Sequence, residues 1–399
     1  MRVDQLDKQI LDLCYNISVT YRIGLNAHLL NLSASYRGAG ISWYSFHLLR
    51  HLTPAPDLAY TVFLSEPRAR EQLTHLTVAR SRLPTQQPLA RIFWEQGVQP
   101  FVLRQEQIAL LHGFAYAGPL ASAVPWLVTI HDLSFIRYPE TFNAANRLYL
   151  TWAVRHAARH ARCLLAVSES TKRDLVELLG ADARKIAVIY SGIEARFAPV
   201  QDRAALDTWR AQRHLPAKMI LFVGTLEPRK NVAHLIHAFA RFKRATHLPH
   251  KLVLAGSRGW KYAQVDAAIE QEEMNDHVIF TGYLPQAELP LCYQAAELFV
   301  YPSRYEGMGF PPLEAMATGV PVITSNVSSL PEVAGDAALQ VSPDDPVALA
   351  EAMAHVLSDT ALREQMIARG LAHAATFTWE RTAHQTADLY RALLAQREA

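Results

Sequence analysis

The sequence predicts an α/β protein with two Rossmann-like domains, each a doubly wound parallel sheet covered by helices. Two observations support this prediction. The chain has 399 residues, which is long for one domain and suits two. Near-continuous apolar runs alternate with helical stretches along most of its length. This alternation is typical of buried parallel strands joined by crossover helices.

The first half is predicted to begin with an extension, residues 1–20, whose apolar residues recur at helical spacing. Helices are expected at Ile41–Leu52, at the basic segment Asn143–Arg162, and from the capping residues Ser168–Thr171 to about Gly180. The predicted strands are Tyr21–Ala27, Tyr60–Leu64, Arg91–Phe93, Ile108–Leu111, Trp126–Ile130, Cys163–Val167 and Ile186–Tyr190.

The second half is more regular, because each of its five apolar runs ends in a small residue and precedes a helical stretch. These runs are Ile220–Gly224, Leu252–Gly256, Val278–Gly282, Leu298–Ser303 and Val320–Ser325. If their order in the sheet is 3-2-1-4-5, the topological switch point lies between the first and the fourth strand. Ligands of such sheets bind at the carboxyl ends of the strands there.

We expect four segments in all. They are the extension 1–20, a first domain 21–205, a second domain 206–375, and a final helical segment 376–399. The charged, weakly periodic stretch Ala195–Pro216 is interpreted as the linker and the hinge of any domain closure.

The stretch Tyr301–Ala317 holds the strongest candidate site. A strand end is followed by the turn Glu306–Gly309 and by a helix start with two prolines. The N–H groups and dipole of such a helix start attract anions. Glu306 and Glu314 flank the turn as acceptors for sugar hydroxyls. The alternative is an ordinary tight turn with two solvated glutamates.

The switch-point rule places a second loop, Thr225–Asn231, opposite Arg304–Phe310. Its Arg229 and Lys230 would then face the anion-binding turn. A solvated turn is the alternative interpretation of this basic pair. Backbone groups of Tyr283 and Leu284, after the third run, could hold a nucleobase.

Two further candidates lie in the first half. Gly38 and Gly40 precede a helix and could let a phosphate approach the backbone, although two glycines are common in loops. His131 stands at the carboxyl end of the strand Trp126–Ile130, where α/β sheets hold ligands. A histidine hydrogen-bonded to a neighbouring loop would give the same pattern. Asp132 is expected to orient that loop or the imidazole.

Composition narrows the class of protein. The formal net charge is +2, but residues 1–205 carry about 22 basic and about 16 acidic residues. This excess could favour an anionic acceptor or a membrane surface, and a plain solvated surface is the simpler explanation. Cys14, Cys163 and Cys292 are far apart and lack metal-ligand spacing, as expected in a reducing compartment. With no apolar run long enough to span a bilayer, a cytoplasmic protein is predicted.

Five motifs carry a family resemblance. They are VTIHDLSF at Val128–Phe135, VSES at Val167–Ser170, GTLEPRKN at Gly224–Asn231, FTGYLP at Phe280–Pro285, and YPSRYEGMGFPPLEAMATGVPVI at Tyr301–Ile323. With these motifs the chain resembles the group 1 (family 4) retaining glycosyltransferases of the GT-B fold, over essentially all residues after 20.

The resemblance implies that the active site lies in the cleft between two Rossmann-like domains. It implies that Glu314 accepts hydrogen bonds from ribose and Glu306 from the donor sugar. Lys230, with Arg229, would neutralise the diphosphate, and His131 would touch the donor sugar near the reacting carbon.

By the same resemblance, the backbone N–H groups of Met308, Gly309 and Phe310 would meet the sugar or diphosphate, and Gly40 would let the first domain approach it. Two departures from the family matter. Thr225 stands where many relatives have a basic residue, and the first-domain loop has Gly38 and Gly40 separated by an alanine.

The implied activity is the transfer of a hexosyl group, mannosyl or glucosyl, from a nucleotide-diphosphate sugar to a sugar, lipid-linked or small-molecule acceptor. GDP-mannose is the first choice of donor and a UDP-sugar the second. No other cofactor and no nucleic acid are expected, and a peripheral contact with the inner membrane face is left open. The resemblance implies retention at the anomeric carbon, for which we favour attack on the face that the diphosphate leaves.

No metal is expected, because no Asp-x-Asp pair follows a strand and Asp344-Asp345 is interpreted as a helix cap. The alternatives are a nucleotide-sugar-binding protein without transfer activity and a nucleotide-sugar epimerase. A nicotinamide oxidoreductase is disfavoured, because no Gly-x-Gly-x-x-Gly follows a first strand with an acidic residue downstream.

Overall fold

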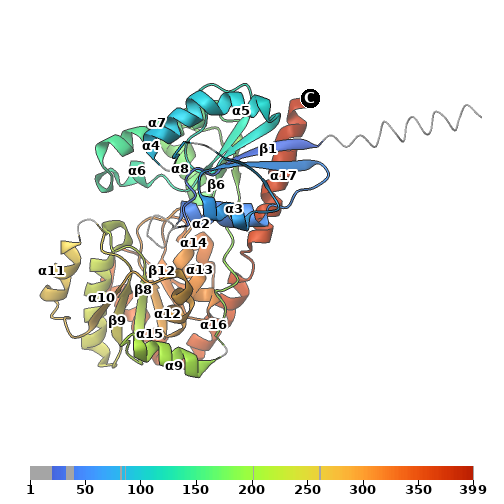
Figure 1. The fold of residues 1–399 in the computed structure, drawn as a ribbon. Helices are drawn as coiled ribbons and strands as arrows, with labels where there is room; N and C mark the ends of the chain where they lie inside the picture. Colours follow the sequence, from blue (N-terminus) through green and yellow to red (C-terminus); the bar gives the residue numbers. More distant parts are fainter. Residues whose placement is uncertain are drawn as a thin grey trace, which may run out of the picture. The chain divides into compact units, whose positions relative to one another are not determined.

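The computed structural model describes residues 20–32, 40–80, 83–85, 87–200, 202–259 and 262–398. The predicted extension, apart from Thr20, and the candidate Gly38 therefore lie outside the described residues. The chain forms two sheets flanked by helices, as the sequence predicts (Figure 1).

The first sheet has seven strands in the order β3-β2-β1-β4-β5-β6-β7. The pairs β1–β2, β2–β3, β1–β4 and β4–β5 are parallel. The strands are β1 (Tyr21–Asn26), β2 (Leu58–Leu64), β3 (Thr77–Arg80), β4 (Ile108–Gly113), β5 (Trp126–Ile130), β6 (Cys163–Ala166) and β7 (Ile186–Val188).

The helical elements of this half are α2 (Ile41–His51), α3 (Pro67–Gln72), α4 (Pro88–Phe93), η2 (Trp94–Val98), α5 (Gln99–Gln105), α6 (Ser134–Arg137), η3 (Pro139–Thr141), α7 (Ala144–His160), α8 (Glu169–Leu179) and η4 (Ala183–Lys185). The predicted strand Arg91–Phe93 was wrong, because these residues end α4. Three apolar or amphipathic residues cannot distinguish a strand from one side of a helix. Strand β3, at one edge of the sheet, was not predicted.

The second sheet has six parallel strands in the order β10-β9-β8-β11-β12-β13. The predicted order 3-2-1-4-5 is confirmed, and a sixth strand extends one edge. The strands are β8 (Met219–Val223), β9 (Lys251–Ala255), β10 (Val278–Gly282), β11 (Leu298–Tyr301), β12 (Val322–Ser325) and β13 (Leu339–Val341).

The helical elements around it are α9 (Arg203–Gln212), η5 (Pro228–Lys230), α10 (Val232–Thr246), α11 (Ala263–Gln271), η6 (Gln286–Glu288), α12 (Leu289–Gln294), α13 (Phe310–Ala317), α14 (Leu330–Ala334), α15 (Pro346–Ser358), α16 (Thr360–Ala374) and α17 (Trp379–Glu398). The predicted linker Ala195–Pro216 contains α9. Its Leu206 and Trp209 are buried, and the Trp209 indole donates to Glu288. Its charged residues are the solvent side of a docked helix.

Burial on both faces explains the apolar composition of the central strands. All five residues of β8 and all four of β11 are buried. On α10, Leu235, Ile236 and Phe239 are fully buried in the same core. A parallel strand in this position exposes no face to water, so its sequence does not alternate.

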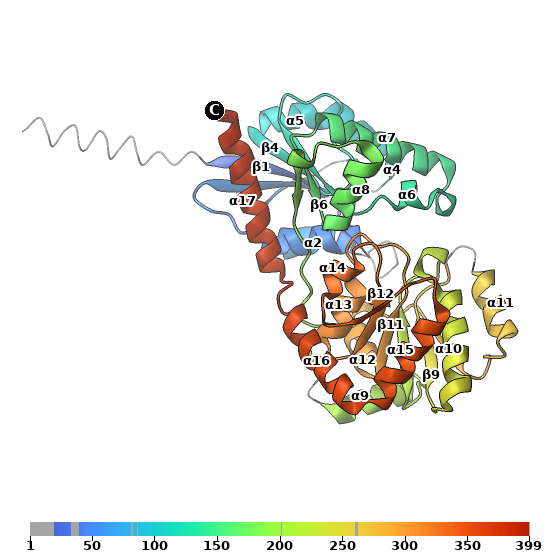
Figure 2. The same ribbon diagram turned by 180° about the vertical axis from the view of Figure 1, so that it is seen from behind.

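Two compact units are distinguished by their internal contacts. The first comprises residues 1–129, 156–164 and 383–399, and the second comprises residues 130–155 and 165–382. From Ala383 onward, α17 belongs to the first unit (Figures 1 and 2). There the Tyr390 hydroxyl lies 2.6 Å from His112 Nδ1. Among the described residues, no helix has the length and apolar character that crossing a bilayer requires.

Candidate active site

The candidate site of the second unit lies where β8 and β11 end. These strands are neighbours in the sheet, with Leu298 beside Ile220 and Phe299 beside Leu221. Since sequence-adjacent strands lie to opposite sides of this pair, it is the topological switch point of the sheet. The loops that follow β8 and β11 therefore meet, as the sequence predicts.

The first loop ends in a short 3-10 helix, η5. Asn231 follows it with a φ of 60°, in the left-handed region, and its side chain donates to the Pro343 carbonyl over 2.7 Å. The Arg229 carbonyl accepts from the Arg304 N–H over 2.9 Å. These contacts hold η5 against the second loop, so Lys230 is directed at that loop rather than at solvent.

The centre of the site is a buried ion pair. Lys230 Nζ lies 2.6 Å from Glu306 Oε1, and both side chains are almost fully removed from solvent. The Tyr301 hydroxyl accepts from Lys230 over 2.6 Å and donates to Glu306 over 2.9 Å. Ser303 Oγ donates to the same carboxylate oxygen over 2.6 Å. Every hydrogen-bonding partner here comes from a loop or strand end at the switch point.

Arg229 ties the two loops together beside this pair. Its guanidinium contacts Glu306 at 3.2 Å and Glu227 at 2.7 Å, and donates to the Tyr305 carbonyl over 2.5 Å. With Lys230, the cluster therefore holds two cations and two carboxylates, and its formal charge is zero.

Burial alone would raise the pKa of Glu306, but the adjacent ammonium of Lys230 and the guanidinium of Arg229 outweigh it and lower the pKa to about 2. Glu306 is therefore ionised at neutral pH. An ionised carboxylate accepts hydrogen bonds and cannot donate them, which suits it to hold hydroxyl groups.

The glycines of the turn are required by its geometry. Gly309, the residue before α13, has a φ of 82°, which side chains rarely adopt, and a Cβ there would lie 2.9 Å from Leu330. A Cβ on Gly307 would meet the His131 carbonyl of the same unit at 1.8 Å. Ser328 and Ser329 hold the turn by donating to the Glu306 carbonyl.

The start of α13 can bind an anion, but it offers few donors. Gly309 carries no side-chain cap, so the positive end of the helix is not neutralised there. Pro311 and Pro312 have no N–H groups. The N–H groups of Met308, Gly309 and Phe310, which were predicted to meet the sugar or diphosphate, belong to this helix start and the turn before it.

Glu314 has a different hydrogen-bond partner from the residues of the ion-pair cluster. The Tyr293 hydroxyl of α12 donates to its carboxylate over 2.7 Å. Burial raises the pKa of Glu314 to about 7. Within the described ranges, no hydrogen bond or ion pair joins Glu314 to Lys230, Arg229 or Glu306. The two glutamates that look alike in the sequence therefore have different electrostatic environments.

The remaining candidates are placed as follows. His131 is half-buried and its carbonyl borders Gly307, while Asp132 orients its loop by accepting from the Ser134 N–H and hydroxyl. Thr225 and Tyr283 are exposed, whereas the Leu284 side chain is buried in the core.

In the first unit, Gly40 is exposed, with a φ of 60°, and among the described residues no atom lies within 4 Å of a Cβ built on it.

Sequence reasoning gave no role to three polar residues of the cluster. Tyr301 and Ser303 lie in the candidate stretch Tyr301–Ala317, and Glu227 lies in the loop Thr225–Asn231, two residues before the basic pair. The only signal for them was their place at the carboxyl ends of β8 and β11.

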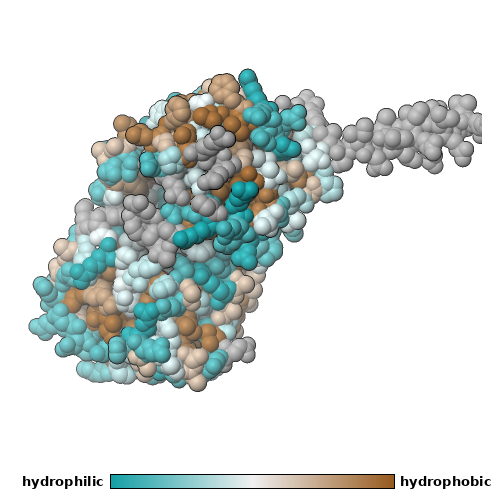
Figure 3. Space-filling model, viewed as in Figure 1, coloured by the Kyte–Doolittle hydropathy of each residue, from teal (hydrophilic) through white to brown (hydrophobic). Residues whose placement is uncertain are grey.

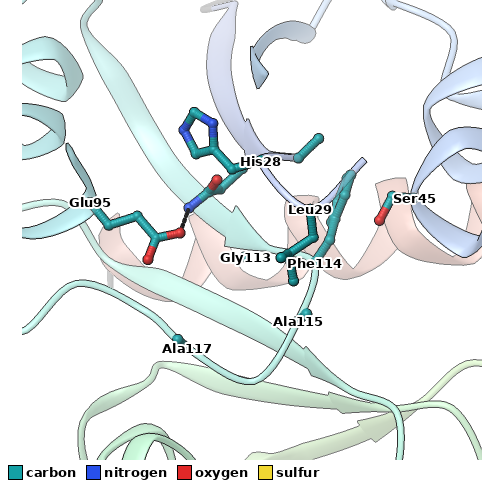
Figure 4. Close-up of a pocket in the computed structure, with 10 residues that line it drawn as sticks. His28, Leu29, Ser45, Glu95, Gly113, Phe114, Ala115 and Ala117 are labelled. Carbon is teal, nitrogen blue, oxygen red and sulfur yellow. Dashed lines mark hydrogen bonds between the residues drawn. The ribbon is translucent and has the colours of Figure 1, made fainter. Parts of the chain in front are cut away.

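A second polar pocket lies in the first unit, at the carboxyl ends of β1 and β4, which are its switch-point strands (Figure 4). Asn26 donates to Glu95 over 3.2 Å, while Asn26 Oδ1 and His28 Nε2 are buried and have no hydrogen-bond partner among the described residues. Burial raises the pKa of Glu95 to about 6 and lowers that of His28 to about 3. Such orphan atoms can bind water or a hydroxyl group. No residue of this pocket was predicted from the sequence.

No metal centre is recognisable in the part of the chain that the structure describes, where no three of its His, Cys, Asp and Glu side chains converge. Asp345 caps α15 by accepting from the N–H groups of Val347 and Ala348, as predicted. Asp344 pairs with Arg304 at 2.8 Å.

Comparisons with known proteins agree with this architecture. The model of the glycosyl transferases group 1 matches residues 207–373, and that of Glycosyltransferase Family 4 matches residues 38–197. The O-antigen chain mannosyltransferase B of Escherichia coli is 34% identical over 297 residues, which cover 74% of this chain and 77% of that protein.

Two solved structures share the fold. Sucrose-phosphate synthase from Thermosynechococcus elongatus superposes with a TM-score of 0.73 at 24% identity, over 94% of this chain and all of that chain. HepE of Anabaena, in complex with UDP and glucose, has a TM-score of 0.69 at 18% identity, over 93% of this chain and all of that chain.

The buried ion pair generates a prediction about stability. Glu306→Gln should lower the free energy of unfolding by about 3 kcal/mol at pH 7, because it leaves Lys230 buried beside a neutral group. In the folded protein the pKa of Glu306 is about 2, below its ordinary value of 4.5. Its contribution to the free energy of unfolding is therefore fully present above pH 4.5 and is lost as the pH falls toward 2.

Urea unfolding of wild type and Glu306→Gln should therefore give free energies of unfolding that differ most at neutral pH, and the difference should shrink as the pH falls from 4.5 toward 2. The control is Lys218→Ala, which removes the exposed partner of Glu297 and should cost only about 0–1 kcal/mol. Equal stability of Glu306→Gln and wild type at pH 7 would contradict the prediction.

Proposed function

The chain belongs to the group 1 glycosyltransferases and has their GT-B fold, and on this premise we propose that it transfers a hexosyl group, mannosyl or glucosyl, from a nucleotide-diphosphate sugar. The glycosyltransferase class follows from the relatives. The choice of sugar, the mechanism and the acceptor are the proposal.

One observation carries the proposal in this chain. Lys230 of the β8 loop and Glu306 of the β11 loop are in contact at the switch point, 2.6 Å apart, beside the uncapped start of α13. A sugar nucleotide needs cations or N–H groups for its diphosphate and acceptors for its sugar hydroxyls. Both kinds of group lie side by side here.

We propose that donor binding rearranges this cluster. Without a ligand its charges cancel, since Glu306 and Glu227 balance Lys230 and Arg229. When a diphosphate binds, Lys230 turns from Glu306 to a phosphate oxygen, and a sugar hydroxyl donates to the carboxylate in its place. Arg229 stays between the loops and keeps Glu306 ionised.

Transfer with retention and without a metal is part of the same proposal. A leaving diphosphate must be stabilised by positive charge. Lys230 and the start of α13 supply this charge from the chain itself. The acceptor would attack the face that the diphosphate leaves, with a phosphate oxygen as the base.

The mannosyltransferase relative favours GDP-mannose, and the UDP complex of the structural neighbour keeps a UDP-sugar in second place. Because that relative is an O-antigen chain enzyme, we propose a sugar or lipid-linked acceptor, and hence a cytoplasmic enzyme that works at the inner face of the membrane.

The first experiment identifies the donor. GDP-mannose, UDP-glucose and ADP-glucose are compared as ligands in thermal unfolding of the wild type, and one of them should raise the midpoint temperature. Lys230→Ala should reduce that shift and lower turnover at least about 100-fold, because a cation facing the leaving group is lost. Lys218→Ala is the matched control. No shift with any of the three donors, or a full shift with Lys230→Ala, would contradict the proposal.

The second experiment tests the chemistry with the donor so identified and a sugar acceptor. The anomeric configuration of the product, followed by NMR from the first turnover, should be that of the donor. Activity should persist in a chelator. An inverted product would refute retention, and activity that returns only with added magnesium or manganese would refute metal independence. Release of nucleotide without any acceptor would point to an epimerase or a hydrolase.

The pKa of Glu314 gives a prediction about pH. If its carboxylate holds the ribose, nucleotide binding should weaken several-fold from about pH 8 to about pH 6, because a protonated carboxyl is the poorer acceptor. The measurement is the nucleotide Kd by calorimetry at each pH.

Two variants control the pH measurement. Tyr293→Phe removes a hydrogen bond that lowers the pKa of Glu314, so the transition should move to higher pH. Glu314→Gln should abolish the pH-dependent transition in the nucleotide Kd. The assignment fails if the wild-type Kd is flat over this range.

A further inference from the structure

The first unit exposes large apolar side chains along one helical run. Elements α4, η2 and α5 are continuous from Pro88 to Gln105. One side of the run is buried in the unit through Trp94, Gln99 and Leu103. The exposed fractions on the other side are 83% for Leu89, 63% for Phe93 and 69% for Phe101. These values mark side chains that the folded chain itself leaves in water.

The π-helix η2 brings these side chains to one side. Leu89 and Phe93 are four residues apart and share a side of α4. Phe93 and Phe101 are eight residues apart, which overruns two α-helical turns of about 3.6 residues each. The wider turn of η2 takes up the extra residue. The Phe93 ring lies over exposed Gly97, 3.8 Å from a Cβ built there, between the two phenylalanines.

A neighbouring loop adds a fourth apolar side chain. Gln96 of η2 accepts from the Leu120 N–H over 2.7 Å and donates to the Gly118 carbonyl over 3.5 Å. Leu120 is 49% exposed. Figure 3 shows hydrophobic side chains gathered over the part of the first unit where α4 and α5 lie. We call Leu89, Phe93, Phe101 and Leu120 the α4–α5 surface.

The exposed charged side chain within the run Pro88–Gln105 is basic. The run Pro88–Gln105 contains a single carboxylate, Glu95, which is buried, and the loop Gly118–Pro125 contains none. Arg104 is exposed three residues after Phe101, on the same side of α5. On α7, His156 hydrogen-bonds the Pro119 backbone, and exposed Arg159 follows it by one turn. An apolar surface edged by arginines complements an anionic surface.

We propose that the α4–α5 surface docks the protein onto an anionic lipid bilayer. The phenylalanine and leucine side chains enter the boundary between head groups and acyl chains, and Arg104 and Arg159 contact lipid phosphates. The docking follows from this surface alone. Its purpose, to bring the enzyme to a lipid-linked acceptor, rests on the proposed function.

The chemistry of the surface favours a bilayer over a protein partner. A protein interface carries about one hydrogen bond per 100–200 Å². From Leu89 to Phe101 the exposed residues of this run are Leu89, Phe93, Gly97 and Phe101, none of which has a polar side chain, and exposed Arg104 follows at the end of the run. The boundary between lipid head groups and acyl chains needs no hydrogen bonds from these side chains, and it binds surfaces that combine aromatic and basic side chains, as this one does.

The test is co-sedimentation of the full chain with vesicles. Wild type should bind vesicles of phosphatidylglycerol and phosphatidylethanolamine more tightly than vesicles of phosphatidylcholine. Phe93→Ser combined with Phe101→Ser should lower the partition coefficient at least about tenfold, because two apolar side chains no longer enter the bilayer. Arg104→Glu should weaken binding to the anionic vesicles only, and high salt should remove that difference.

Val347→Ser is the matched control, because Val347 is an exposed apolar side chain on α15 of the second unit. This variant should bind vesicles as wild type does. The proposal is overturned if wild type stays in the supernatant, or if the double phenylalanine variant sediments as wild type does. It is also overturned if wild type binds no vesicles and light scattering shows that wild type is an oligomer whereas the double phenylalanine variant is a monomer. Nucleotide-induced thermal shifts of the same variants report on the proposed function separately.

Discussion

The buried contact between Lys230 and Glu306 is the interaction on which the second unit's site depends. Its residues lie 76 positions apart, and they meet only because β11 is placed beside β8 rather than beside β10. Removing two charges from water is costly, and a buried ion pair is weak grounds for stability. This cost, at the switch point where α/β sheets bind ligands, is one ground for the donor site that we propose there.

Both oxygens of the Glu306 carboxylate already accept hydrogen bonds from the chain itself. Tyr301, Ser303 and Arg229 each contact the Glu306 carboxylate, so both of its oxygens are occupied. On the proposed function, the donor binds by replacing existing hydrogen bonds. A ligand with both an anion and hydroxyl groups suits this exchange, since the anion can pair with Lys230 and a hydroxyl group can donate to Glu306.

The two units carry different chemistry. In the second, the polar groups are charged, paired and close to neutral in sum. In the first, the pocket at β1 and β4 holds neutral orphan atoms of Asn26 and His28, and the α4–α5 surface leaves apolar side chains in water. On the proposed function, the second unit binds the charged donor and the first unit binds the acceptor.

The sequence by itself determined the parallel sheets, the strand order of the second sheet, and the loops that carry Lys230 and Glu306. Continuous apolar runs and glycine turns are local signals, and the switch-point rule connects them. Tertiary structure alone decided that Arg91–Phe93 is helical, that Ala195–Pro216 holds α9, and that Tyr301 joins the ion pair. These outcomes depend on which neighbours bury a residue, and such neighbours are distant in the chain. The different pKa values of Glu306 and Glu314 have the same origin, since only the fold surrounds one with cations and the other with a tyrosine.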